Sequence, residues 1–293
     1  MFAESLREGH AESYFPLSSH LVNQSDPAYC GVTTLLVVLN AMSIDPNVRW
    51  RGGWRFFGDE EMLLERCCLD AERVRREGVS LEQFAGLSRC QGARYDLKRP
   101  IDGDDGRRDG GAASGIGLEE FRRDVVNAVR SPPRPDDESD GDRDGFADIV
   151  GAQDRPDGGG CFLVTSFARS SISQTGEGHF SPVAAYHRPS DACLVLDVAR
   201  FKYSPYWVPV GDLYDAMVPE DDATGKSRGW MVMYPPGGSS RSRRKDSEMS
   251  KEQYEGKRPA EGVPLSGTGE RLCPVERIKI DYCRDRHVGL PVT

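Results

Sequence analysis

The sequence predicts an α+β fold, with helices in its N-terminal part and an antiparallel sheet after them. Before residue 130, apolar residues recur at the three- and four-residue spacing of helices that bury one face. From Cys161 onward, short apolar runs alternate with turns rich in Pro, Ser, Asp and Gly, which is typical of antiparallel strands. The 293 residues suffice for one large domain or two small ones.

The N-terminal part contains several helix signals. The longest apolar segment follows Cys30 and ends near residues 40–46. Ser80 and Gln83 have the spacing of a capping box, which pairs two backbone N–H groups at a helix start. Asp59 is placed to cap another helix. Helices are predicted within 2–20, from Cys30 to about 40, over 59–66, from Ser80 onward, and over 118–130. The charged stretch 71–77 is expected on the surface, and Gly78 is expected to end it.

The C-terminal part contains five apolar runs that are short enough to be strands. Turn residues join most of them, so an antiparallel meander is expected. A short helix is expected over 212–217. Strands are predicted over 161–167, 179–187, 193–198, 207–210 and 229–234.

Composition divides the chain after the Pro-Pro pair at 235–236. We expect one folded domain over 1–236 and a short, mostly disordered tail over 237–293. Two segments inside the domain, 102–117 and 131–160, are rich in Gly, Asp and Pro. Both are expected to be disordered insertions, because they cannot bury enough apolar surface to offset their ordering entropy.

Charge and hydropathy exclude several classes of function. The net charge is −9, so no global basic field attracts nucleic acid or anionic lipid. No apolar run approaches the roughly 20 residues of a membrane-spanning helix, and residues 1–10 lack the pattern of a secretory signal. A reducing, cytoplasmic location is therefore expected, with the eight cysteines as thiols. Their spacing indicates no zinc site.

The stretch from Asn23 to Asn40 contains the strongest candidate for chemistry. Pro27 precedes the apolar helix, where its missing N–H costs nothing. Cys30 would lie at the helix N-terminus, where unpaired N–H groups and the helix dipole stabilise a thiolate. Gln24 would supply an oxyanion-hole donor beside it. The alternative is a buried cysteine that acts as a small hydrophobe.

His179 and Asp197 are the candidate partners of Cys30. His179 opens a predicted strand and Asp197 lies near the end of the next, so strand pairing would bring them together. A carboxylate supports a charged imidazole, which in turn favours a thiolate. His187 is a rival base, and Arg200 a rival partner for the carboxylate. The order Cys, His, Asp, with 149 residues between Cys and His, is that of papain-like enzymes.

Five segments of the sequence have a distinctive composition: Gln24–Gly31, Cys67–Cys68, Gln174–Pro182, Leu196–Tyr203 and Trp207–Pro209. They resemble the phytochelatin synthase family, and the resemblance covers residues 2–234. It implies a papain-like fold, in which a helical lobe carries the nucleophile and an antiparallel sheet lobe carries the His and Asp.

The resemblance assigns four catalytic roles. It implies Cys30 as nucleophile and His179 as general base and acid. It implies Asp197 as the orienter of the imidazole and Gln24 as the oxyanion-hole donor. The implied activity is that of a γ-glutamylcysteine dipeptidyl transferase, which makes phytochelatins from glutathione through a thioester on Cys30.

The resemblance also implies how substrates are held. Arg169 and Arg200 would bind substrate carboxylates, with Lys202 and Tyr203 as further candidates for the same pocket. No cofactor is expected to be tightly bound and no protein metal site is assigned, because Cd²⁺ or Zn²⁺ would arrive as a glutathione thiolate complex. Glutathione, phytochelatins and heavy-metal ions are the expected partners, without nucleic acid or membrane. A homodimer is an assembly that the resemblance allows.

Two other functions stay open at this stage. The same residues acting on water would give a peptidase that releases glycine from glutathione or its conjugates. A thiol protein that buffers heavy metals is the second alternative, although the eight cysteines are scattered and not clustered. The insertions and the short C-terminal region depart from the family, and Cys273 and Cys283 are not expected to bind metal.

Overall fold

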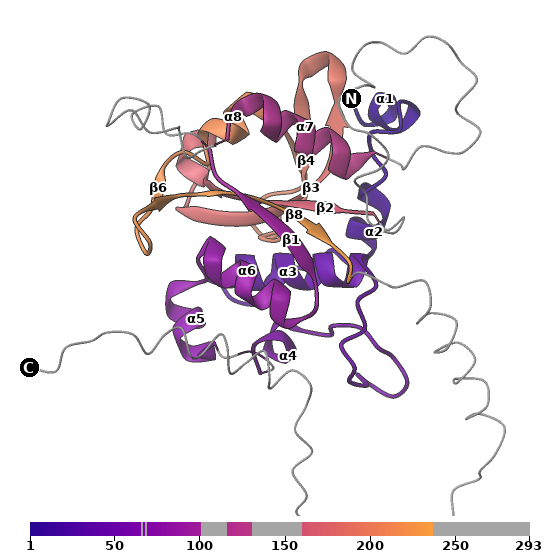
Figure 1. Ribbon diagram of the computed structural model, residues 1–293, viewed down its shortest axis with the longest axis vertical. Coiled ribbons are helices and arrows are strands. Elements are labelled where there is room, and N and C mark those ends of the chain that lie inside the picture. The colour runs from indigo at the N-terminus through magenta and orange to yellow at the C-terminus, as the bar shows by residue number, and fades with distance from the viewer. Residues whose placement is uncertain (66, 68, 101–115, 131–159, 237–293) are drawn as a thin grey trace, which may run out of the picture. The chain divides into compact units, whose positions relative to one another are not determined.

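The computed structural model describes residues 1–65, 67, 69–100, 116–130 and 160–236 (Figure 1). Residues Met1–Pro235 form one compact unit. The two predicted insertions lie outside the described residues except at their ends. The predicted tail, 237–293, lies outside them entirely.

Helix α3, Cys30–Ala41, is the most deeply buried helix of this unit, since every residue from Gly31 to Asn40 is buried. A helix that is apolar on all sides must be covered on all sides. Strand β3 covers one side of α3, and the helices α2, α4 and α6 cover others. This packing explains why the segment has almost no polar face.

The main sheet has six antiparallel strands in the order β1-β8-β2-β3-β4-β5. Strands β2 to β5 form the predicted meander, and β8 returns to pair with β2. The predicted α+β class is confirmed. The strands are β1 Arg94–Lys98, β2 Phe162–Ala168, β3 Gly178–His187, β4 Ala192–Val195, β5 Tyr206–Pro209 and β8 Gly229–Tyr234, with a separate pair of β6 Glu220–Asp221 and β7 Lys226–Ser227.

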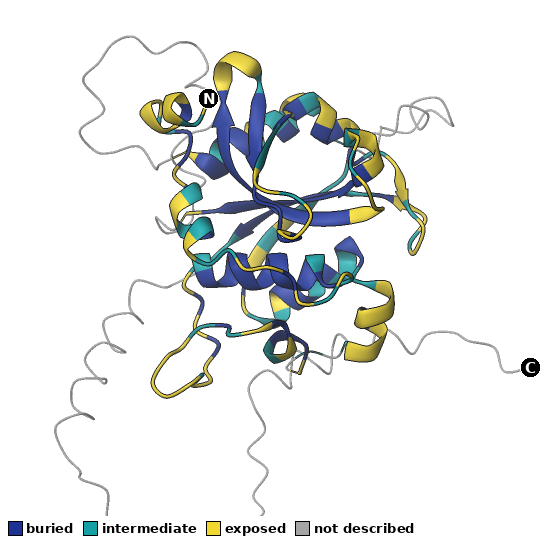
Figure 2. Cartoon of the chain, turned by 180° about the vertical axis from the view of Figure 1, so that it is seen from behind, coloured by how far each residue is buried: buried dark blue, intermediate teal, exposed yellow. Residues whose placement is uncertain are grey.

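The sheet separates two hydrophobic cores. Side chains alternate between the faces of a strand, so Phe162 and Val164 join the core around α3 while Leu163 and Phe167 join the other. Figure 1 shows α3 and α6 on one face, with α7 (Leu118–Val129) and α8 (Val210–Asp215) on the opposite face. The strands are therefore mostly buried, as their dark blue colour in Figure 2 shows.

The shorter helices confirm several sequence signals. The predicted capping box between Ser80 and Gln83 is present. Asp59 accepts a hydrogen bond from the N–H of Met62, 2.8 Å away. Gly78 ends α5 with a φ of 71°, where glycine is favoured. The bounds are α1 Phe2–Arg7, α2 Tyr14–Ser19, α4 Glu60–Glu65, α5 Ala71–Glu77 and α6 Leu81–Cys90.

Two elements differ from the prediction. Residues 2–20 contain two helices instead of one, because the chain turns at Gly9 with a φ of 70°. The sequence analysis did not predict β1, since Arg94–Lys98 is charged and lacks a clear apolar face. Its place at the edge of the sheet explains that composition.

Two boundaries also differ. Strand β4 ends at Val195, so Asp197 lies beyond the ladder and not within it. The end of the first predicted insertion is wrong, since Ile116 forms a bridge with Pro100 and Gly117 is the N-cap of α7. In the described parts of the chain, no helix has both the length and the hydropathy to cross a bilayer.

Candidate active site

Cys30 is the first residue of α3, and Gly31 lets this end of the helix approach β3 closely. A Cβ at Gly31 would lie 2.3 Å from Cγ2 of Val79 and 3.3 Å from the ring of Phe180. Real Cβ atoms do not come as close as the first distance. Glycine at this position therefore allows Cys30 to lie beside the strand that carries His179.

His179 is the second residue of β3, and its side chain is buried. Phe167 lies opposite it in the β2–β3 register, with the two rings edge to face at 5.7 Å. The hydroxyl of Thr34 donates a hydrogen bond to the carbonyl of Phe180, 3.0 Å away. This bond joins the helix of the cysteine directly to the strand of the histidine.

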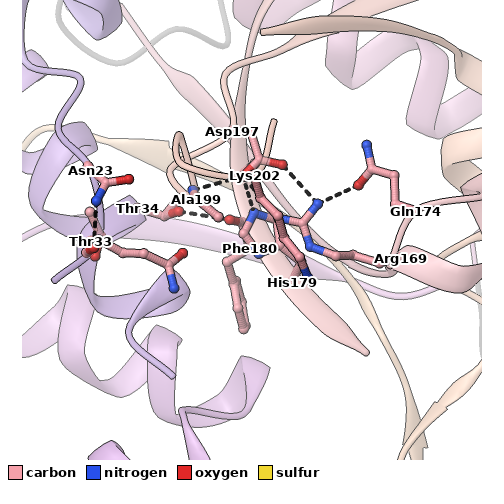
Figure 3. A network of polar contacts seen from close by, with 12 residues as sticks. Asn23, Thr33, Thr34, Arg169, Gln174, His179, Phe180, Asp197, Ala199 and Lys202 are labelled. Atoms are coloured by element: carbon pink, nitrogen blue, oxygen red, sulfur yellow. Dashed lines mark hydrogen bonds and ion pairs between the residues drawn. The ribbon is translucent and has the colours of Figure 1, made fainter. Parts of the chain in front are cut away.

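Asp197 is fully buried. Its carboxylate lies beside the imidazole of His179 (Figure 3). Its Oδ1 atom is 3.0 Å from Nε2 of His179. The same oxygen accepts hydrogen bonds from the backbone N–H of Ala199, at 2.8 Å, and from Nη2 of Arg169, at 2.9 Å. The bond to Ala199 forms an Asx turn, which bends the chain away from the sheet after β4.

The surroundings of Cys30 favour its thiolate. Burial raises the pKa of the thiol, but the hydrogen bond and positive charge of His179 oppose this effect. The backbone of Phe180 and the charge of Arg169 lower the pKa further, and the net result is a pKa below the ordinary value. The thiolate, which is the nucleophilic form of cysteine, is therefore easier to form here than on an ordinary cysteine.

His179 and Asp197 support each other's charged forms. Burial lowers the pKa of His179, but contacts with Asp197 and Cys30 raise it above the ordinary value. Burial raises the pKa of Asp197, whereas His179 and Arg169 lower it to about 2. The structure thus brings Cys30, His179 and Asp197 together, and each of these groups favours the charged form of its neighbour.

Gln24 is buried in the loop before α3. Its amide nitrogen donates to the carbonyls of Asp26 and Pro27, at 2.8 and 2.9 Å. Its backbone N–H donates to the carbonyl of Val198, 2.9 Å away, which fixes this loop beside the Asp197 turn. The amide therefore holds the loop in this structure, and its role as an oxyanion-hole donor stays a prediction.

Arg169 is buried and its guanidinium has partners inside the protein. Besides Oδ1, its Nη1 lies 2.9 Å from Oδ2 of Asp197, and it also donates to the side-chain oxygen of Gln174 (Figure 3). The guanidinium lies 4.9 Å from the centre of the Tyr203 ring. These contacts account for its charge without a substrate, so they support a role in holding Asp197.

Lys202 and Tyr203 fasten the turn that leads into β3. Nζ of Lys202 donates to the carbonyl of Thr175, 2.7 Å away, and the Tyr203 hydroxyl accepts from the N–H of Thr175 at 2.8 Å. Arg200 is exposed, and no described residue pairs with it. Of the four predicted substrate-binding residues, Arg200 is thus the one to which no described residue supplies a hydrogen bond or an ion pair.

Glu60 is a buried carboxylate that the sequence analysis missed. Its Oε1 accepts hydrogen bonds from the N–H of Ser25, at 3.1 Å, and from the hydroxyl of Thr33, at 2.9 Å. It thereby joins the loop before Cys30 to the first turn of α3. Its spacing with Leu63 and Leu64 on the apolar face of α4 is the sequence signal that would have found it.

The rival base, His187, lies elsewhere. It is the buried last residue of β3, about 26 Å along the strand from His179. Its Nε2 lies 2.9 Å from a carboxylate oxygen of Glu4, and its Nδ1 lies 2.7 Å from the hydroxyl of Ser190. The pairing of Asp197 with Arg200 is also not observed, since Arg169 takes that place.

A pocket of about 260 Å³ lies beside strand β5. It is lined by Ser171–Gln174, Tyr206–Pro209 and Asp212. None of the triad residues lines it. The groups that can carry out a reaction are therefore those around Cys30: an activated sulfur, an acid or base beside it, and a fixed carboxylate behind. Such a set supports acyl transfer through a covalent thioester.

Comparison with known proteins agrees with this geometry. Residues 1–230 match the family model described as phytochelatin synthase. Glutathione gamma-glutamylcysteinyltransferase 3 of Lotus japonicus is 38% identical over 233 residues, which are 80% of this chain and 40% of that protein. The enzyme named glutathione gamma-glutamylcysteinyltransferase 1 in Arabidopsis thaliana is 37% identical, and the match covers 80% of this chain and 40% of that protein.

A fungal relative gives the same result. The glutathione gamma-glutamylcysteinyltransferase of Schizosaccharomyces pombe is 33% identical, with 80% of this chain and 46% of that protein covered. The chain thus spans less than half the length of these relatives. A double glycine motif protease from an AMS/PCAT transporter matches over 73% of this chain and 90% of its own chain, with 11% identity and a TM-score of 0.37. That TM-score is too low to support an assignment. With its family match and its three named relatives, the chain belongs to the phytochelatin synthase family.

Proposed function

We propose that this protein transfers the γ-glutamylcysteinyl group of one glutathione to the amine of another, or of a growing phytochelatin. The observation that carries the proposal is the position of His179 between Cys30 and the buried carboxylate of Asp197. The names of the relatives support glutathione as the substrate. We also propose a papain-like arrangement of the triad, on the basis of its order along the chain.

The first half of the reaction forms a thioester. The Cys30 thiolate attacks the carbonyl that joins cysteine to glycine in glutathione. The backbone N–H of Cys30, which has no acceptor within its helix, stabilises the oxyanion. Gln24 joins it once its amide releases the carbonyl of Asp26 or Pro27. His179 then gives its proton to the departing glycine amine. The γ-glutamylcysteinyl group remains bound to the sulfur.

The second half returns the enzyme to its starting state. The amine of the acceptor attacks the thioester, and His179 takes the proton that this amine loses. The Cys30 thiolate leaves and the new peptide bond is complete. Asp197 keeps the imidazole in one orientation during both halves, because Arg169 and Ala199 hold its carboxylate in place.

We propose that Cd²⁺ or Zn²⁺ enters as substrate, bound to the thiolate of the acceptor. Arg200 would attract the carboxylates of this anionic complex, since it is exposed near the Asp197 turn. Activation by heavy metals therefore depends on the acceptor and not on a metal held by the protein. A cytoplasmic location and a homodimer stay predictions.

Mass spectrometry of products distinguishes transfer from hydrolysis. The protein is incubated with glutathione, with and without Cd²⁺, and peptides are weighed. Peptides with two or more γ-glutamylcysteine units support transfer, and Cys30→Ser should abolish them. Only γ-glutamylcysteine and glycine would indicate the peptidase instead. Turnover that survives in Cys30→Ser would contradict both functions.

A further inference from the structure

Two cysteines outside the active site lie in direct contact. Cys67 follows α4 and Cys90 is the last residue of α6, and their sulfur atoms are 2.7 Å apart. Both residues are partly exposed, so reagents in solution can reach them. We call these two residues the thiol pair. The proposed acyl transfer makes no use of it.

The distance between the sulfurs favours a disulfide over a metal site. A disulfide bond is about 2.0 Å long, so the sulfurs need to approach by only about 0.7 Å. Two thiolates on one tetrahedral zinc ion, each about 2.3 Å from the metal, would be about 3.8 Å apart. We propose that Cys67 and Cys90 form a reversible disulfide, which makes the thiol pair a redox modification site.

A neighbouring amide distinguishes the two sulfurs. Nε2 of Gln91 donates a hydrogen bond to Sγ of Cys67, 3.1 Å away, and also contacts the carbonyl of Leu63 at 3.4 Å. A donor on the sulfur favours its thiolate, so Cys67 is the attacking thiol. Cys193 is a contrast, because it is buried among apolar residues and burial raises its pKa to about 12.

The oxidant we propose is a small disulfide, such as oxidised glutathione. The Cys67 thiolate attacks one sulfur of this disulfide, forms a mixed disulfide and releases one small thiolate. The Cys90 thiolate then attacks the Cys67 sulfur and releases the second small thiolate. Two protein thiols lose two protons and two electrons, and the small disulfide gains the two electrons. Excess reduced glutathione reverses both steps.

The bond would cross-link two helices that cover α3. It would join the end of α4, which carries Glu60, to the end of α6. Phe84 on α6 stacks on Phe180, with ring centres 5.1 Å apart and an angle of 8°, next to His179. The thiol pair is thus connected through α6 to the strand of the catalytic base, although it lies outside the site.

Peptide mapping tests the proposal on the full-length chain. Cys30→Ser is used as background, so that the active-site sulfur does not react. The protein is equilibrated with oxidised glutathione, alkylated, digested and analysed by mass spectrometry. We expect a Cys67–Cys90 cross-linked peptide that disappears when reduced glutathione is added. Cys67→Ser and Cys90→Ser should abolish it, whereas Cys68→Ser, at the adjacent position, should retain it.

Three outcomes would overturn the proposal. One is the absence of the cross-linked peptide, and another is a cross-link of Cys90 to Cys68 at equal or higher yield. The third is that Cd²⁺ or Zn²⁺, added to the reduced protein, binds at a stoichiometry of one and is lost in both single variants. That result would assign the thiol pair to a metal. The test does not depend on the proposed transferase activity, since the background variant lacks its nucleophile.

Discussion

The hydroxyl of Thr34 donates to the carbonyl of Phe180 across 146 residues of sequence, and this bond lies between the nucleophile's helix and the base's strand. Both groups are buried, so neither has water as a substitute partner. This side chain therefore helps to fix how α3 is placed along β3. The positions of Cys30 and His179 depend on this placement.

Replacing Thr34 with Val should destabilise the protein by about 1–2 kcal/mol, because the Phe180 carbonyl loses its buried donor. Thr34→Ser, which keeps the hydroxyl, is the matched control and should lose less. Urea unfolding measures both. A Val variant as stable as the wild type would show that the bond contributes nothing to the packing of α3 on β3.

Gly31→Ala should reduce kcat/KM by about 100-fold while the protein still folds. The new Cβ collides with the Val79 side chain, so the start of α3 must shift and move Cys30 away from His179. Adding Val79→Ala to this variant should restore part of the activity, because it removes the colliding atom. If Gly31→Ala alone is fully active, the close packing of Gly31 against Val79 is not required for activity.

Asp197→Asn should lower kcat at least tenfold and change the pH profile of Cys30 alkylation. Without the carboxylate, the pKa of His179 falls, and the imidazolium that lowers the pKa of Cys30 is lost. Alkylation by iodoacetamide should then begin at higher pH than in the wild type. An unchanged pH profile would show that Asp197 does not influence the pKa of Cys30 through His179.

Asp197 should make the protein sensitive to acid below about pH 4. Its pKa in the folded state, about 2, is lower than the ordinary value of 3.8, so its ionised form stabilises the fold above that ordinary value. This stabilisation is lost as the pH falls toward 2. Arg169→Gln should raise the pKa of Asp197, cost about 3 kcal/mol and move acid unfolding to higher pH. Arg200→Gln, an exposed arginine, is the control.

Glu60→Ala should destabilise the protein by about 1–3 kcal/mol, because the N–H of Ser25 loses its acceptor, whereas the hydroxyl of Thr33 keeps the carbonyl of Tyr29. Glu60→Gln keeps an acceptor oxygen and should lose less. We expect kcat to fall more than KM rises in the Ala variant, since the loop before Cys30 loosens. Denaturant unfolding and steady-state kinetics together separate the two effects.

Much of the fold was predictable from local signals. The capping box at Ser80 and the apolar segment after Cys30 each identify an element by a rule of a few residues. Strand β1 could not be found this way, because its charged sequence is accommodated only by an edge position in the sheet. The end of β4 was missed for a similar reason, since the Asx turn of Asp197 depends on a tertiary setting.

The candidate site, like the fold, was predictable only in part from the sequence. Cys30, His179 and Asp197 were predictable because their chemistry and order are distinctive. Arg169 was predicted as a substrate ligand, yet it contacts Asp197, because an isolated sequence does not reveal which carboxylate a buried arginine meets. The contact between Cys67 and Cys90 could not be predicted for a related reason. Cys67 and Cys90 lie 23 positions apart in sequence, without a recognisable spacing motif.

The order of these residues has a consequence during synthesis. Cys30 leaves the ribosome 149 residues before His179. Until the later strand is made and folded against α3, the sulfur lacks the imidazole that lowers its pKa. The nascent chain thus carries an ordinary thiol, and the reactive thiolate is created only when translation of the sheet is complete.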